Sequence, residues 1–167
     1  MIREFRAGDL DEVMSIWLSG NREAHSFVPS SFFEDRFDGV SSAISKAEVY
    51  VFDDGEVKGF IGLDGSYVAG LFVRCDSRGA GIGRELLSHA LSLKGNLSVH
   101  VFSRNEKAMR FYLRNGFFPV CSFENEDFGE NEVLLKNPVK EYRVKPKYLE
   151  RQILQLQYYF MKTVKWF

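Results

Sequence analysis

The chain has 167 residues, of which 45% are hydrophobic and 27% charged, with a formal net charge of −1, as is typical of one soluble globular domain. No apolar run approaches the roughly 20 residues of a membrane span, and charged residues interrupt the N-terminal segment where a signal peptide has its apolar region. Because residues 1–137 carry a net charge of −6 and residues 138–167 one of +5, we expect no nucleic-acid partner and favour a cationic one, such as an amine or a basic peptide.

The first half of the chain predicts a strand, two helices and three more strands. Residues 2–5 form the first strand. Asp9 and Glu12 resemble a capping box that begins an amphipathic helix reaching about Ser19. A second helix is expected after Pro29. Three strands follow in residues 48–73, the first two joined by an Asp-Gly turn.

The second half alternates between the two element types. Apolar residues fall on one face of a helix that starts near Ile82 and ends at the sequence KGN, residues 94–96. A strand spans residues 97–102, and Asn105 and Gly116 are typical of the two ends of the next helix. Two strands, 117–124 and 131–136, complete the order β-α-α-β-β-β-α-β-α-β-β. This order predicts a three-layer α/β fold.

The sequence RGAGIG, residues 78–83, lies between a strand and a helix and is typical of an anion cradle. It lacks the Lys-Ser/Thr of a P-loop, and its glycines do not fit the G-x-G-x-x-G register of dinucleotide sites. The pattern that fits is R-x-x-G-x-G, from Arg78 to Gly83, at the start of a helix.

LFVRCDSRGAGIGRELL, residues 71–87, resembles the acyl-CoA-binding motif of the GNAT (Gcn5-related) N-acetyltransferases, and NEKAMRFYLRNGF, residues 105–117, is similar to the next motif of that family. The resemblance extends from residue 1 to about 136. A weaker likeness in residues 16–27 points to bacterial protein-lysine or small-amine acetyltransferases. The resemblance to the GNAT family implies a GNAT-like fold with a mixed central sheet and helices on both faces, and an acetyltransferase domain over 1–137. The tail lies outside the resemblance, and its own residues predict a basic linker and a C-terminal helix over 138–167.

The resemblance also implies that acetyl-CoA is the acetyl donor. Backbone groups of one strand would contact its pantetheine and acetyl carbonyl, namely Leu71, Phe72 and Val73. The pyrophosphate would lie on the backbone of the glycine loop, namely Arg78, Gly79, Ala80, Gly81, Ile82, Gly83 and Arg84. Asn105 would both cap its helix and contact the cofactor.

Three side chains are candidates for catalysis. Tyr112 matches the family's tyrosine near the CoA sulfur and would protonate the leaving thiolate; the alternative is a core aromatic between two phenylalanines. His100 stands where the ribosomal-protein N-terminal acetyltransferases have a glutamate base, so it either acts as base, directly or through water, or binds a main-chain carbonyl. His25 would bind the acceptor or relay a proton, with Glu23 a weaker candidate. His89 is expected to be solvated.

Two functions remain open at this point. One is transfer of an acetyl group to a primary amine (a protein lysine, an N-terminus or a small amine) by direct attack in a ternary complex. The other is a non-catalytic acyl-CoA sensor or scaffold whose tail engages a partner. The tail, residues 147–167, predicts one helix that packs on its own domain, forms a homodimer or binds a partner, without stable membrane insertion. The phenylalanines near His25 either wall an acceptor pocket or form the edge of the core.

Cys75 and Cys121 are too few for a disulfide framework, and they lack the clustering of a zinc site. A reduced, cytoplasmic setting and the absence of a metal site are therefore the expectation.

Overall fold

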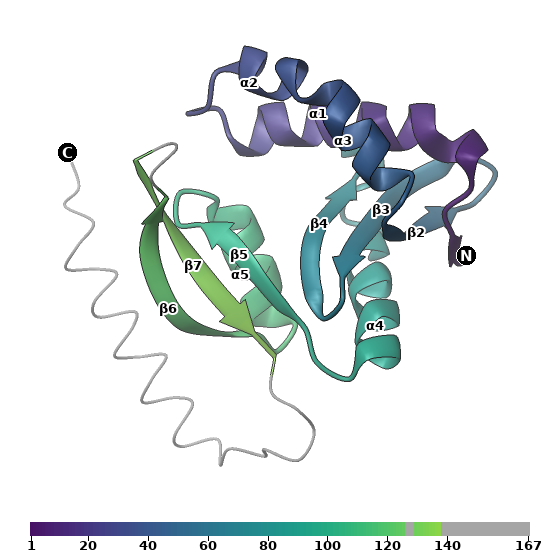
Figure 1. The fold of residues 1–167 in the computed structure, drawn as a ribbon. Helices are drawn as coiled ribbons and strands as arrows, with labels where there is room; N and C mark the ends of the chain where they lie inside the picture. Colours follow the sequence, from purple (N-terminus) through teal and green to yellow (C-terminus); the bar gives the residue numbers. More distant parts are fainter. Residues whose placement is uncertain (126–128, 138–167) are drawn as a thin grey trace. The chain divides into compact units, whose positions relative to one another are not determined.

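The computed structural model describes residues 1–125 and 129–137, and in this part of the chain seven strands form one mixed sheet (Figure 1). The spatial order is β1-β2-β3-β4-β5-β7-β6, and every neighbouring pair is antiparallel except β4 and β5. The strands are β1 (Ile2–Glu4), β2 (Glu48–Asp53), β3 (Val57–Asp64), β4 (Tyr67–Val73), β5 (Ser98–Phe102), β6 (Phe118–Asn125) and β7 (Glu130–Lys136).

Helices cover both faces of this sheet. The helices are α1 (Leu10–Ala24), α2 (Ser30–Asp35), α3 (Phe37–Ile44), α4 (Ile82–Lys94) and α5 (Glu106–Arg114), with short 3₁₀ turns η1 (Ala7–Asp9) and η2 (Cys75–Ser77). Successive strand residues point to opposite faces. Phe60 of β3 accordingly joins a core with α1, whereas Ile61 joins a second core with α4 and the buried Tyr112 of α5. The predicted three-layer fold is confirmed.

The predicted start of the first helix is wrong in its detail. The Asp9 side chain does not cap α1. Its carboxylate instead accepts hydrogen bonds from the Arg3 guanidinium at 2.7 and 2.8 Å and from the Arg6 backbone N–H at 2.7 Å. Glu12 accepts from the Val57 backbone N–H at 2.6 Å. Both acidic residues therefore tie α1 to the sheet, because longer-range donors compete successfully for them.

The first helix is also longer than predicted, and residues 30–44 form two short helices where one was expected. A Cβ on Gly20 would lie 2.7 Å from the Phe72 ring, so glycine lets α1 run close over β4. Asn21 stays helical and donates its side-chain amide to the Trp17 carbonyl at 2.9 Å. Trp17 meets the rings of Phe33 and Phe37 edge-on, which fixes α2 and α3 against α1.

The later elements follow the sequence closely. Asn105 caps α5 by accepting the Ala108 backbone N–H at 3.1 Å, and Gly116 has φ +84° just beyond the helix end. Among the helices described, none is long and apolar enough to cross a membrane. The predicted tail helix and its dimer or partner contacts fall in residues 138–167, outside the described residues.

Candidate active site

The parallel strands β4 and β5 separate soon after they meet. They pair only at Tyr67 and Ser98, whereas β4 stays paired with β3 as far as Val73. Figure 1 shows the two strands diverging along their length. Within the described part of the chain, no strand pairs with the β5-facing edge of β4 over residues 71–73. Backbone groups on this edge are therefore left without a neighbouring strand; that they bind the donor, as the resemblance implies, stays a prediction.

The glycine loop follows β4 and leads into α4. Gly79 and Gly81 have φ values of +85° and +89°, a conformation that residues with a side chain adopt only with strain. Gly81 is the N-cap of α4, and no side chain caps this helix. The first-turn N–H groups of α4, at the positive end of the helix dipole, are thus free to bind an anion.

Arg78 is held by the surrounding protein. Its Nε donates to the Val73 carbonyl at 3.0 Å, and its Nη1 donates to both carboxylate oxygens of Glu23 at 2.7 Å. Lys107, at the start of α5, also reaches Glu23 at 3.3 Å. The hydrogen bond from Arg78 is the main reason that the Glu23 pKa lies below its usual value. Glu23 thus joins the end of α1 to the glycine loop and to α5.

Tyr112 lies in the core, with 5% of its surface exposed. Its ring packs against Phe111 and Phe117, each with centroids 5.2 Å away. Burial raises the pKa of the phenol well above its usual value, and the nearby Tyr67 phenol adds to this effect. Tyr112 is therefore protonated at neutral pH, as a proton donor must be. Packing and proton donation both fit this position.

His100 projects from the outer face of β5. Its neighbours Val99 and Val101 are buried, so the predicted alternation along this strand is confirmed. The imidazole is 37% exposed, and its centroid lies 5.4 Å from that of Tyr67 and 5.1 Å from that of Phe123. The Tyr67 side chain also forms a hydrogen bond with the His100 backbone. Tyr67 thus contacts His100 at the end of β4 where the two strands are still paired.

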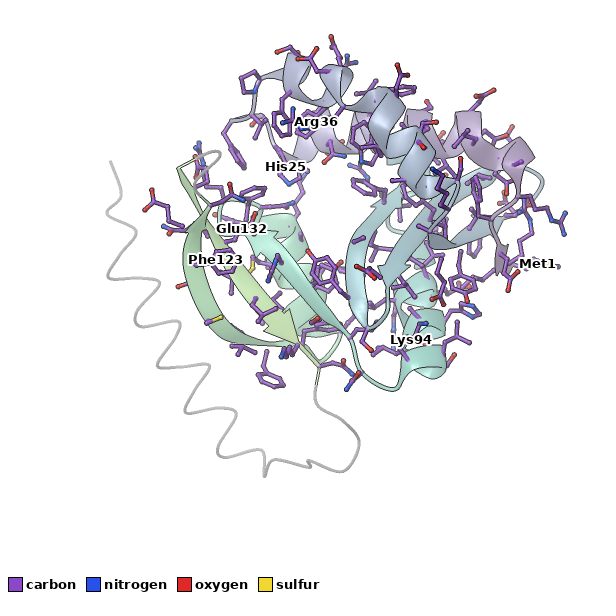
Figure 2. All side chains as sticks on the ribbon, in the orientation of Figure 1. Met1, His25, Arg36, Lys94, Phe123 and Glu132 are labelled. Carbon is purple, nitrogen blue, oxygen red and sulfur yellow. The ribbon has the colours of Figure 1, made fainter. Side chains whose placement is uncertain are left out.

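The sequence reasoning missed Glu132, on β7. Its Oε2 lies 3.9 Å from Nδ1 of His100, and its Oε1 accepts the Asn125 side-chain amide at 2.9 Å. Register places Glu132 between Phe102 of β5 and Phe123 of β6, and Figure 2 shows Glu132 and Phe123 next to each other. The alternating pattern of residues 130–136 places Glu132 on the outer face, but only strand pairing reveals that it meets His100.

His25 lies apart from His100, at the end of α1. Its ring is surrounded by Phe27, Phe33 and Phe102, with centroids 5.3 to 6.1 Å away. Burial lowers the pKa of His25, so it is neutral at pH 7, and its Nδ1 is buried without a hydrogen-bond partner among the described residues. Of the phenylalanines considered as a pocket wall, Phe33 and Phe37 pack in the core, and both Phe27 and Phe33 contact the His25 ring.

The expectation that His89 is solvated is wrong. Its ring is half-buried against Tyr50, with the two centroids 4.7 Å apart, because β2 extends alongside α4.

A shallow cavity of about 270 Å³ lies elsewhere, beside α1. Its lining shares no residue with the predicted site and includes Asp11, Glu12, Ser15, Ile16, Val57 and Arg74.

Comparison with known proteins decides the family. The model of the acetyltransferase (GNAT) domain matches residues 45–119. The peptidyl-lysine N-acetyltransferase YjaB of Escherichia coli is 32% identical over 136 residues, which cover 80% of this chain and 92% of YjaB. The chain belongs to the GNAT N-acetyltransferase family. The solution structure of apo YjaB superposes on this GNAT enzyme with a TM-score of 0.72, at 30% identity, covering 81% of this chain and 95% of that one.

Other relatives of this GNAT enzyme agree with that result. The peptidyl-lysine N-acetyltransferase YiaC of E. coli is 28% identical over 130 residues, covering 75% of this chain and 89% of YiaC. A ribosomal-protein-alanine N-acetyltransferase from Brucella melitensis shares the fold, with a TM-score of 0.63 at 16% identity, over 82% of this chain and 98% of that one. The predicted family, fold and enzyme class are therefore confirmed. The sensor alternative finds no support in these relatives, which are named for acetyl transfer.

Proposed function

We propose that this enzyme transfers the acetyl group of acetyl-CoA to lysine side chains of proteins or peptides, by direct attack in a ternary complex. The observation that carries the proposal is the open edge of β4 beside the uncapped start of α4. The strand edge would offer backbone groups to an extended pantetheine, and the helix start would offer N–H groups to a pyrophosphate. The lysine acceptor is inferred from YjaB and YiaC, both named as peptidyl-lysine N-acetyltransferases.

The donor would bind along β4 and the glycine loop. Backbone of Leu71, Phe72 and Val73 would contact the pantetheine and the acetyl carbonyl. The loop residues Arg78, Gly79, Ala80, Gly81, Ile82, Gly83 and Arg84 would hold the pyrophosphate. Asn105 uses its Oδ1 for the helix cap, so its Nδ2 would make the cofactor contact. We infer from these placements that residues 1–137 are the acetyltransferase domain.

The chemistry requires three proton transfers. The acceptor ammonium would lose a proton to His100, directly or through water, and the neutral amine nitrogen would form a bond to the acetyl carbonyl carbon. Backbone N–H groups of β4 would stabilise the negative charge on the carbonyl oxygen. The bonded nitrogen would then lose its second proton to water as the C–S bond breaks, and Tyr112 would donate a proton to the CoA thiolate and regain one from solvent. His25, neutral in its aromatic surroundings, would help to bind the acceptor.

Charge supports a basic acceptor. Residues 1–137 carry a net charge of −6, and Glu132 of β7 lies 3.9 Å from His100. A lysine-containing peptide brings the complementary charge. The cytoplasmic location remains a prediction from the sequence.

The proposal is tested by offering acetyl-CoA with three acceptors. These are an Nα-acetylated lysine peptide, a lysine-free peptide with a free N-terminus, and a small primary amine. Thiol release and mass spectrometry report transfer. We expect the lysine peptide to be acetylated at its Nζ with the highest kcat/KM. Preference for either other acceptor would contradict the acceptor assignment, and tight CoA binding without any transfer would support the sensor alternative.

A further inference from the structure

We propose that Glu132 is a positioning residue for His100. Its carboxylate would hold Nδ1–H of the imidazole, so that Nε2 is left to take the proton of the acceptor amine. This inference rests on the proposed function, because it assumes that His100 is the base. It adds a charged partner on β7, a strand that lies outside both sequence motifs.

Strand register brings the two residues together. In the antiparallel pair β5–β7, His100 lies opposite Leu134 and Phe102 lies opposite Glu132. His100 and Glu132 are therefore diagonal neighbours on the same face, a separation that long side chains span. The result is the 3.9 Å approach between Nδ1 and Oε2, which is longer than a hydrogen bond but within the range of an ion pair.

Glu132 is held in place and has one basic neighbour. Asn125 donates to its Oε1 at 2.9 Å, which leaves Oε2 for the imidazole. Its side chain is only 13% exposed, so its charge is less screened than that of a surface carboxylate. Among the described residues, His100 is the basic group that Glu132 meets, whereas Glu130, two residues earlier, pairs with Arg104 at 2.6 Å.

The other side chains that contact His100 among the described residues are the rings of Tyr67 and Phe123, and Glu132 is its charged neighbour. Tyr67 on β4 contacts the imidazole, and burial followed by the charge of Glu132 raises the pKa of this phenol, which keeps it neutral. On β6, Phe123 contacts the ring. Cys121 of the same strand pairs with Leu134, which is the β7 residue opposite His100. The rings of Tyr67 and Phe123 restrict the imidazole, and Glu132 selects which nitrogen faces the sheet.

This arrangement suits a general base. A carboxylate beside Nδ1–H favours the tautomer in which Nε2 carries the lone pair, and it stabilises the imidazolium that forms when Nε2 takes a proton from the acceptor ammonium. The proton then leaves Nε2 for solvent. Glu132 keeps its charge throughout and takes up no proton itself.

The test compares Glu132→Gln with Glu130→Gln as a matched control on the same strand. We expect Glu132→Gln to lower kcat about tenfold or more, with little change in the KM for acetyl-CoA, and to move the acidic limb of the pH–rate profile to lower pH. The control should keep the activity and profile of the unaltered enzyme. In a His100→Ala background, Glu132→Gln should have no further effect, because both changes remove the same function.

Several outcomes would overturn the proposal. One is full activity in Glu132→Gln when His100→Ala has lost activity. Another is a loss of kcat on adding Glu132→Gln to His100→Ala that equals the loss on adding it to the unaltered enzyme. A raised acceptor KM with unchanged kcat would place Glu132 in acceptor binding instead. If the unaltered enzyme acetylates no lysine peptide, the proposed function fails by itself. The 15N NMR signals of the imidazole then still decide the pairing: the chain has three histidines, and His100→Ala identifies the relevant signals. The neutral ring must carry its proton on Nδ1 in the unaltered enzyme and lose that preference in Glu132→Gln.

Discussion

At the scale of single residues, Tyr112 has a packing role in the structure and a chemical role in the proposed function. It is buried against two phenylalanines, and burial keeps its phenol protonated. In the proposed function this phenol would supply a proton only as the C–S bond breaks, so its contribution would belong to the transition state. Binding of the donor in the ground state should depend on it little.

Tyr112→Phe should therefore lower kcat by roughly 100-fold, the lower end of typical general acid–base effects, and leave the Kd for acetyl-CoA nearly unchanged. Steady-state kinetics and calorimetric titration with CoA measure the two quantities. Tyr50→Phe is the control, because its hydroxyl bonds Glu48 on β2, away from the glycine loop. Unchanged turnover in Tyr112→Phe would assign the residue to packing alone.

Residue identity alone predicted part of the local structure of the candidate site. The helix cap by Asn105 and the left-handed glycines of the loop depend only on nearby backbone, so their sequence pattern was sufficient. Glu132 acts on a residue 32 positions away through the register of β5 with β7, which no local pattern specifies. His89 was misjudged for the same reason, because its neighbour Tyr50 comes from a distant strand.

At the scale of elements, the glycine loop determines how α4 begins. Gly81 has φ +89°, and nothing lies within 4 Å of where its Cβ would be. Space is therefore available and the constraint is the backbone conformation itself. A side chain at this position would strain the loop and stand where a phosphate would approach.

Gly81→Ala should destabilise the protein by about 1–2 kcal/mol, the cost of a left-handed backbone for a residue with a Cβ, and should weaken CoA binding. Chemical unfolding and CoA titration test both effects. Gly39→Ala is the matched control: this glycine lies inside α3 with open space around it, so alanine should stabilise the helix by about 0.5–1 kcal/mol. Equal stability of the two variants would refute the conformational argument.

Element boundaries show where sequence patterns stop being informative. The strands and α5 were predicted to within a residue or two because alternation, caps and turns agree. The end of α1 was placed at Ser19, five residues early, since Gly20 and Asn21 are typical of helix termini. Packing of Gly20 on the Phe72 ring overrides that preference, and it is a long-range contact.

At the scale of the whole described fold, Asp9 joins the N-terminal strand to the rest of the sheet. The Arg3 guanidinium binds Asp9 and Asp53, which links β1 to the start of α1 and the end of β2. The hydrogen bond from Arg3 is the main cause of the lowered Asp9 pKa. A lowered pKa means that the folded state favours the charged form, so the stabilisation is present above the ordinary value of 3.8 and is lost as the pH falls below it.

Asp9→Asn should reduce the free energy of unfolding by about 1–3 kcal/mol at pH 7, because it leaves a partly buried guanidinium with one carboxylate fewer. The difference between the variant and the parent should shrink as the pH is lowered through 3.8 and beyond. Urea unfolding at pH 7 and at acid pH measures it. Asp64→Asn, exposed at the end of β3, is the control and should have little effect at either pH. A difference that stays constant with pH would contradict the linkage.

The contact between α1 and β4 has a further consequence for how the two sides of the proposed site depend on each other. The Phe72 ring fits between Gly20 and Gly70, where any Cβ would lie 2.7 Å from it. Its backbone belongs to the strand proposed to bind the donor. A larger residue at position 20 must therefore move either this ring or α1. Because Glu23, near the end of α1, binds Arg78 of the glycine loop, a shift of α1 would reach the loop as well.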